Sequence, residues 1–273
     1  MRDERPLTSI RTRFRAVLLP LLAALPLTGC STMADGRRRA EGAALFPGWA
    51  RAGQAAKRAL LRPEVWAPAA GALAIGAAGA DKRISAWASG KTPVFGSADK
   101  ARKASKKLIS VSNAVYWASV AAAPSGPYGK VWYYDKAKTA AAGVAANTAA
   151  FQAALSLQKI VGRPRPNGAG RSSFPSLHTA YAASQTMSAW TNFECLRMTG
   201  TERALIRGGL DAVPLATAWA RVEAKAHYPS DTLAAMALSS FLSSFVSEAF
   251  LGGPAVSVEA LGKTPALVWR AGF

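Results

Sequence analysis

The chain has 273 residues, half of them hydrophobic, and a formal net charge of +19. This length accommodates one large domain or two small ones with a sizeable core. The positive charge indicates an anionic partner, such as an anionic membrane surface or a phosphorylated lipid. Nucleic acid is not expected, because no recognisable module or aromatic-basic interleaving is present. Two cysteines, Cys30 and Cys195, exclude a disulfide framework.

Residues 1–29 have the pattern of a bacterial secretion signal. Five arginines come before an apolar stretch over residues 16–27, which is short for a membrane span. The segment ends in a sequence that resembles a lipobox, Leu27-Thr28-Gly29-Cys30. That resemblance implies cleavage before Cys30 and acylation of its sulfur, and Ser31 resembles a sorting signal for the Gram-negative outer membrane. We expect a lipoprotein facing the periplasm; an uncleaved signal anchor is the alternative.

The next segments are predicted from composition, apolar periodicity and helix start and stop signals. Residues 30–46 are small, polar and basic and are predicted to be a linker. A helical bundle is expected over residues 47–251, followed by a tail over 252–273. Helix-like segments are 47–62, 97–123, 138–159, 176–192, 201–225 and 232–250. Residues 65–80 are apolar and alanine-rich, residues 84–96 end in turn signals, and Pro214 is a candidate kink.

The segment 97–123 begins with a run of basic residues, which are Lys100, Arg102, Lys103, Lys106 and Lys107. Such a run is usually a solvated helix face. Binding of anionic head groups is the alternative.

The two histidines of the chain, His178 and His227, lie in two short segments rich in arginine, serine and proline, residues 162–179 and 221–231. Arginine forks neutralise the non-bridging oxygens of a phosphate. A neutral imidazole attacks phosphorus, a carboxylate fixes its tautomer, and a second imidazole protonates the leaving oxygen. Each piece alone is more often structural, but together they predict phosphoryl transfer through a histidine.

Prolines place these groups at helix ends. Pro175 predicts a helix that starts near Ser176, whose free N–H groups, including those of Ser176 and Leu177, would form an anion site. Pro229 predicts a second start, with Asp231 in the first turn, where a carboxylate is favourable. From there Asp231 can reach back to His227.

The motifs resemble those of the type 2 phosphatidic acid phosphatase family, which shares its site with bacterial class A acid phosphatases and vanadium haloperoxidases. The family pattern is Lys-x6-Arg-Pro, then Pro-Ser-Gly-His, then Ser-Arg-x5-His-x3-Asp. The matching residues are Arg165-Pro166, then Pro175-Ser176-x-His178, then Arg221, His227 and Asp231. The resemblance covers roughly residues 60–250. It implies that His227 is the nucleophile, Asp231 its orienting partner and His178 the general acid. It also implies that Arg165, Ser176 and Arg221 hold the phosphate.

Three positions depart from the family pattern. The family lysine falls on Gln158, so that either Lys159 or Arg163 supplies the missing charge, or activity is weakened. Leu177 replaces the family glycine, although its backbone N–H can still donate to phosphate. Ala220 replaces the serine before Arg221, which removes one hydroxyl.

We therefore expect an all-α bundle of about six helices with the phosphate site at the helix ends. The expected function is a metal-independent phosphatase without a cofactor, acting on a phosphate monoester or lipid diphosphate through a phosphohistidine. The alternatives are a phosphate- or lipid-binding protein with little turnover and a vanadate-dependent haloperoxidase. Mean hydropathy is only +0.09, which favours a lipid-anchored globular bundle over an integral one. The sequence leaves the oligomeric state open.

Overall fold

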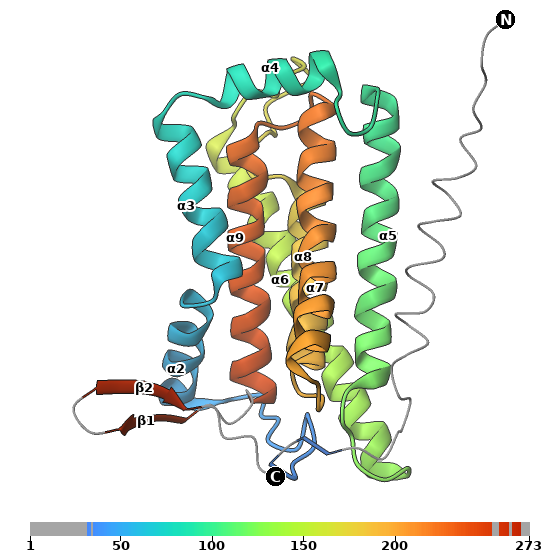
Figure 1. Ribbon diagram of the computed structural model, residues 1–273, viewed down its shortest axis with the longest axis vertical. Helices are drawn as coiled ribbons and strands as arrows, with labels where there is room; N and C mark the ends of the chain where they lie inside the picture. The colour runs from blue at the N-terminus through green and yellow to red at the C-terminus, as the bar shows by residue number, and fades with distance from the viewer. Residues whose placement is uncertain (1–31, 34, 253–256, 262–263, 269–273) are drawn as a thin grey trace, which may run out of the picture.

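The computed structural model describes residues 32–33, 35–252, 257–261 and 264–268, and its helices form an elongated bundle (Figure 1). Eight α-helices, a π-helical turn and two strands occur in this part of the chain. In order they are α2 (Gly48–Leu60), α3 (Pro63–Ala77), α4 (Asp81–Lys91), α5 (Ala98–Ala122), α6 (Lys130–Val161), α7 (Leu177–Phe193), α8 (Gly200–Glu223), α9 (Pro229–Val246), η1 (Ser247–Leu251), β1 (Ser257–Leu261) and β2 (Thr264–Val268).

The helical fold class is confirmed, but the expected count of about six helices is too low. Residues 84–96, expected to end in turns, belong to α4 up to Lys91, and turns follow over residues 93–97 as expected; Asp81 occupies the acidic first turn of α4 and Gly90 falls in its last turn. The apolar segment over 65–80 is largely α3, which starts with Pro63 in its first turn. β1 and β2 pair antiparallel in the tail, where the sequence patterns predicted no strand.

Local signals set most helix boundaries. The Ser97 hydroxyl caps α5 by accepting from the Lys100 N–H at 3.2 Å. Thr199 and Glu202 form a capping box at the start of α8, which continues through Pro214. α6 ends at Gly162, whose φ of 56° is left-handed, as is usual for glycine after a helix. These boundaries place the loops that carry both histidines at one end of the bundle.

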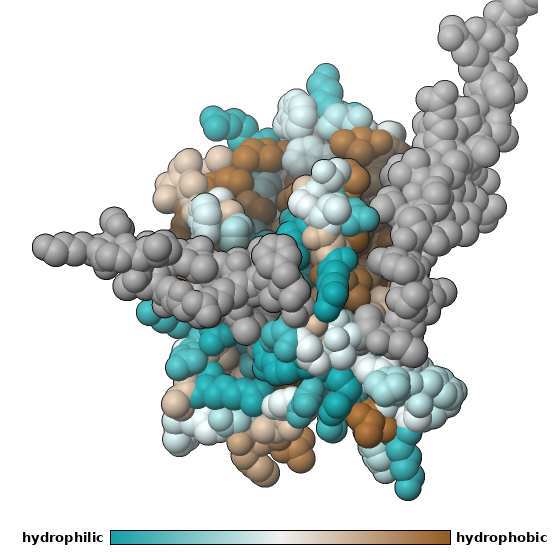
Figure 2. Space-filling model, turned by 60° about the horizontal axis from the view of Figure 1, so that its bottom comes forward, coloured by the Kyte–Doolittle hydropathy of each residue, from teal (hydrophilic) through white to brown (hydrophobic). Residues whose placement is uncertain are grey.

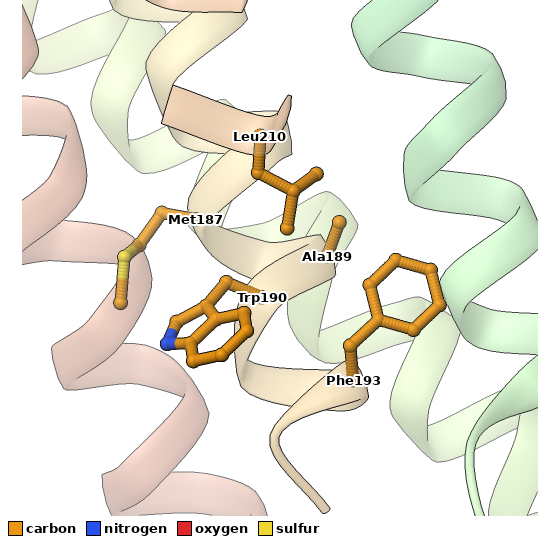
Figure 3. Packing of buried hydrophobic residues seen from close by; sticks show 5 residues of the cluster. All are labelled: Met187, Ala189, Trp190, Phe193 and Leu210. Carbon is orange, nitrogen blue, oxygen red and sulfur yellow. The ribbon is translucent and has the colours of Figure 1, made fainter. Parts of the chain in front are cut away.

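α7 is buried along nearly its whole length, with neighbours α5, α6, α8 and α9 packed around it. Small residues allow these helices to approach closely. Larger apolar side chains gather in its C-terminal half, where Met187, Ala189, Trp190 and Phe193 pack with Leu210 of α8. Figure 3 shows Phe193 pointing toward α5, on the side opposite to Met187. Burial of each large side chain contributes about 2 kcal/mol to stability.

Part of the segment expected to be a linker packs against the end of the bundle opposite to α4 (Figure 1). Arg39 is 2% exposed and donates to the Gly252 carbonyl oxygen at 2.6 Å and to Asn192 Oδ1 at 3.4 Å. Figure 2 shows that this end mixes hydrophilic and hydrophobic residues where grey atoms do not cover it. The predicted signal over 1–29 and lipidation at Cys30 lie outside the described residues.

Candidate active site

α7 and α9 begin at the end of the bundle that α4 crosses (Figure 1), with His178 in the first turn of α7 and His227 just before α9. Two contacts fasten α4 there. At its start, Asp81 accepts from the Ser230 N–H at 3.0 Å. After its end, Glu223 accepts from the N–H groups of Val94 at 2.9 Å and Phe95 at 3.0 Å. α4 is therefore fastened to the motif segments near both of its ends.

The turn after α8 brings His227 back toward Arg221. Lys225 has a left-handed φ of 54°, and the N–H groups of Ala226 and His227 both donate to the Arg221 carbonyl oxygen, at 3.1 and 3.4 Å. Arg221 and His227 are six residues apart in sequence, and this reversal places both at one site. Both side chains are buried, at 7% and 1% exposure.

His227 is held in one tautomer by a backbone group. Its Nδ1 lies 2.6 Å from the carbonyl oxygen of Ser173. Because a carbonyl oxygen can only accept, Nδ1 carries the proton and Nε2 keeps a free lone pair. Burial, with the nearby charge of Arg221, lowers the pKa of His227 to about 3. The imidazole is therefore neutral at physiological pH, as a nucleophile must be.

Asp231 does not take the position that the sequence predicted, since it binds Ser173 rather than His227. Its carboxylate accepts from the Ser173 hydroxyl at 2.5 Å, the Tyr228 N–H at 2.8 Å and Arg163 at 2.6 Å. The reason is its place in the first turn of α9, where it caps the Tyr228 N–H and faces the Ser173 hydroxyl. Ser173, a residue that no sequence motif singled out, thus contacts both Asp231 and His227.

The start of α7 agrees with prediction, although its hydrogen bonds are partly different. Ser176 caps the helix, with Thr179 Oγ1 3.1 Å and the Thr179 N–H 3.5 Å from its hydroxyl. The Ser176 N–H donates to the Asp231 carbonyl oxygen at 3.2 Å, so it is not free for phosphate. Leu177 and His178 occupy the first turn, whose N–H groups have no partner within the helix. The Thr179 N–H faces the Ser176 hydroxyl and the Ala180 N–H donates to the Ser176 carbonyl oxygen, so the anion site expected here has the N–H groups of Leu177 and His178 left to form it.

Of the two residues offered as substitutes for the family lysine, one is exposed and the other is paired with carboxylates. Lys159 is exposed. Arg163 pairs with Asp231 at 2.6 Å and Asp81 at 2.8 Å, and its guanidinium stacks on the Tyr228 ring. Gln158 itself is 5% exposed and donates to the Pro175 carbonyl oxygen at 2.8 Å. Gln158 holds the loop over 173–176, and Arg163 holds the start of α9. Spacing alone cannot reveal these roles.

Positive charge without a matching anion surrounds the two imidazoles. The buried Nε of Arg221 has no hydrogen-bond partner among the described residues. Burial, with the charges of Arg165 and Arg102, lowers the pKa of Arg221 to about 10. Burial and neighbouring positive charges also lower the pKa of His178 to about 4; those charges belong to Arg221, Lys106 and Arg165. Crowded like charges with an unpaired donor are favourable only when an anion binds between them.

Residues that could hold a metal ion do not gather here. Among the described residues, no three His, Cys, Asp or Glu side chains form such a group. The donors around the imidazoles are guanidinium and N–H groups, which match phosphate oxygens.

Two of the described helical segments are long and apolar enough to cross a membrane, α6 and the continuous stretch Pro229–Leu251. Half of the most apolar window of the second lies inside the bundle, as in the core helix of a soluble protein. In α6 only 17% of that window is buried. This gives weak support for an association with membranes.

The comparisons with known proteins agree with the site. A family model described as the PAP2 superfamily matches residues 137–251. The comparisons with curated proteins and with solved structures gave no significant match. The matched segment includes all three motifs, from Gln158 to Asp231. Residues 137–251 of this chain are therefore similar to the PAP2 superfamily.

Proposed function

We propose that the protein is a metal-independent phosphatase that transfers the phosphoryl group of an ester or diphosphate to His227 and then to water. Similarity to the PAP2 superfamily supports a phosphatase-type hydrolase. The observation that carries the rest is the contact of 2.6 Å between His227 Nδ1 and the Ser173 carbonyl oxygen. It leaves Nε2 unprotonated, and the charge of Arg221, whose buried Nε has no partner among the described residues, contributes to the lowered pKa of His227.

In the first step His227 Nε2 forms a bond to phosphorus, and the bond from phosphorus to the leaving oxygen breaks. Arg165, Arg221 and the free N–H groups of α7 neutralise the non-bridging oxygens. His178 gives a proton to the leaving oxygen and then takes one from the water that attacks the phosphohistidine. Burial and the neighbouring positive charges hold His178 neutral, with a pKa of about 4. A bound phosphate offsets the arginine charges, so the pKa of His178 rises when substrate arrives.

An apolar cavity of about 390 Å³ supports a lipid part in the substrate. It lies between α3, α7, α8 and α9, with lining residues that include Pro68, Met187, Trp190 and Leu233. Leu233 is two residues after Asp231, so the cavity begins within one turn of the catalytic end of α9. A hydrocarbon chain fits this lining better than a polar leaving group does.

For localisation we propose a lipid anchor at Cys30 in the periplasmic leaflet of the outer membrane. The lipobox resemblance supports it, as does the packing of Arg39, which fixes the chain nine residues after Cys30. Radiolabelled palmitate should label the wild-type protein in bacterial cells and should not label Cys30→Ser. Equal labelling of both would contradict the anchor.

Trapping of the phosphoenzyme tests the mechanism. Wild type and two variants are mixed with ³²P-labelled para-nitrophenyl phosphate and quenched in alkali, in which phosphohistidine survives. His227→Ala should give no labelled protein. His178→Ala should accumulate label, because the nitrophenolate leaves without a proton while hydrolysis of the phosphohistidine loses its base. Label that persists in His227→Ala would overturn the assignment of the nucleophile.

A phosphate-binding protein with little turnover remains the second candidate function. The specific observation behind it is that Gln158 and Arg163 are both committed to protein partners. Binding of vanadate by wild type, without phosphate release from any ester or diphosphate, would favour it.

A further inference from the structure

α5 lies outside the segment that matches the family model, yet it borders the site. α5 and α7 run side by side from the same end of the bundle (Figure 1). Two hydrogen bonds fix their register. The Ser112 hydroxyl donates to Gln185 Oε1 at 2.7 Å, and Asn192 Nδ2 donates to the Ser119 hydroxyl at 3.1 Å. Both helices advance by the same seven residues between these contacts.

The same register extends to the catalytic end. Seven residues is about two turns of helix. Two turns before the pair formed by Ser112 and Gln185, Ser105 lies opposite His178. Ser105 is fully buried, as this position requires. One turn closer to the end, Ala101 packs with Ala224 and Ala226 on either side of the turn that leads to His227.

Lys106, the next residue, therefore lies at the same level as His178 along the bundle axis. Consecutive helix residues are rotated by about 100°, so Lys106 and Arg102 share one flank of the buried stripe, whereas Lys107 lies on the opposite face of the helix. The charge of Lys106 lowers the pKa of His178, which places the ammonium near that imidazole. Arg102 pairs with Asp99 at 2.5 Å, but the ammonium of Lys106 has no hydrogen bond or ion pair within the described residues.

We propose that Lys106 forms a second anion subsite on the leaving-group side of the phosphate pocket, and that it selects substrates whose leaving group is itself a phosphate. The inference rests on the proposed function, in which His178 marks the leaving side. It assigns a diphosphate monoester as the preferred substrate class. Lys106 supplies positive charge from α5 to a site where Gln158 has none.

The reaction of such a substrate balances without further reagents. His227 Nε2 bonds to the terminal phosphorus, and the bond to the oxygen that bridges the two phosphorus atoms breaks. That oxygen leaves with the electron pair as part of a phosphate monoester, whose charge Lys106 neutralises. Water then releases orthophosphate from His227. The leaving phosphate has a last pKa of about 6, so it needs a proton from His178 far less than an alkoxide does.

The test compares matched substrates on the purified protein. Phosphate release from farnesyl diphosphate and farnesyl monophosphate is measured for wild type, Lys106→Gln, Lys106→Arg and Lys107→Gln. The lipid tail is constant, so the comparison isolates the second phosphate. ADP serves as a soluble diphosphate. Wild type should prefer either diphosphate to the monophosphate, and use of ADP as well as farnesyl diphosphate would mean that the subsite reads the diphosphate alone.

Lys106→Gln should lower kcat/KM about tenfold more for farnesyl diphosphate than for farnesyl monophosphate, as expected for loss of a charged contact. Lys106→Arg should restore most of the difference. Lys107→Gln, which removes the same charge from the opposite face of the helix, should leave the ratio unchanged. An equal effect of Lys106→Gln on both substrates, or the same change in ratio for Lys107→Gln, would overturn the subsite.

Binding separates failure of the subsite from failure of the phosphatase. Calorimetry with inorganic pyrophosphate and with orthophosphate is performed on wild type and Lys106→Gln. The subsite requires that Lys106→Gln weaken pyrophosphate binding more than orthophosphate binding. That result from a protein without turnover would overturn the phosphatase proposal and support the subsite. Equal weakening would overturn the subsite, whatever the activity.

Discussion

The carbonyl oxygen of Ser173 binds Nδ1 of His227 at 2.6 Å, while the hydroxyl of the same serine donates to Asp231 at 2.5 Å. One residue thus fixes the imidazole and connects it to the carboxylate. Burial raises the pKa of Asp231, although the Ser173 hydroxyl and the Tyr228 N–H oppose that shift. The link implies that Asp231 positions His227 through a backbone segment instead of by direct contact.

Ser173→Ala tests this link, because it keeps the carbonyl and removes the hydroxyl. We expect kcat to fall about tenfold, which matches one hydrogen bond to a charged group, with KM little changed. Asp231→Ala should cost more and should lower the melting temperature, since it also leaves Arg163 and the Tyr228 N–H without this partner. Wild-type kcat in Ser173→Ala would mean that the hydroxyl does not position the imidazole.

His227→Ala should lower kcat by about 10³ or more, as deletion of a covalent nucleophile does. Vanadate should still bind, because Arg165 and Arg221 remain. Steady-state kinetics and a vanadate titration of the same preparation measure both quantities. A variant with near-normal kcat would show that another group attacks phosphorus.

The three residues near the family lysine position should respond differently from one another. Gln158→Lys buries a charge where the amide now bonds to Pro175, so we expect lower stability, by about 2 kcal/mol, and no gain in kcat/KM. Lys159→Ala, at an exposed position, serves as the control and should match wild type. Arg163→Ala should lower kcat, because Asp81 and Asp231 lose their shared cation. Denaturant unfolding and kcat/KM measure these effects; a tenfold gain for Gln158→Lys would contradict the structural role of Gln158.

Stability should fall in acid because of His227. Its pKa is about 3 in the folded protein and about 6.5 in an unfolded chain, so between these values the unfolded state binds more protons. Stability is therefore complete above pH ~6.5 and declines as pH falls toward ~3, by about 1.4 kcal/mol per pH unit. Urea unfolding of wild type and His227→Gln between pH 4.5 and 7 isolates this contribution. Parallel curves for the two proteins would show that His227 is not the titrating group.

Activity should survive EDTA, because cationic groups occupy the positions where a two-metal phosphatase places carboxylates. Vanadate should inhibit phosphate release competitively, since it adopts the five-coordinate geometry of the transition state. The vanadate-loaded protein should not oxidise bromide with hydrogen peroxide. Loss of activity in EDTA that a divalent ion restores would contradict the metal-independent mechanism, and bromide oxidation would favour the haloperoxidase alternative.

The sequence by itself determined the helical class, the helix starts at Ser176 and Pro229, and the similarity of residues 137–251 to the PAP2 superfamily. Those features follow from short-range rules: prolines and capping residues set helix ends, and spacing fixes which motif residues share a turn. The point within residues 84–96 at which the helix ends is harder to predict, because helix and turn signals overlap in α4. The hairpin of β1 and β2 lies in a tail without clear alternation.

Only the tertiary structure decided which groups touch. Asp231 could reach His227 by spacing, but Ser173 from another loop occupies that position. The sequence leaves Arg163 as a candidate to bind phosphate, but its guanidinium donates to Asp81, which lies 82 residues earlier in the chain. Lys106 belongs to a basic run of α5, and its height beside His178 is set by two hydrogen bonds between α5 and α7. Contacts between distant segments depend on how whole helices pack, and no local pattern of residues encodes that register.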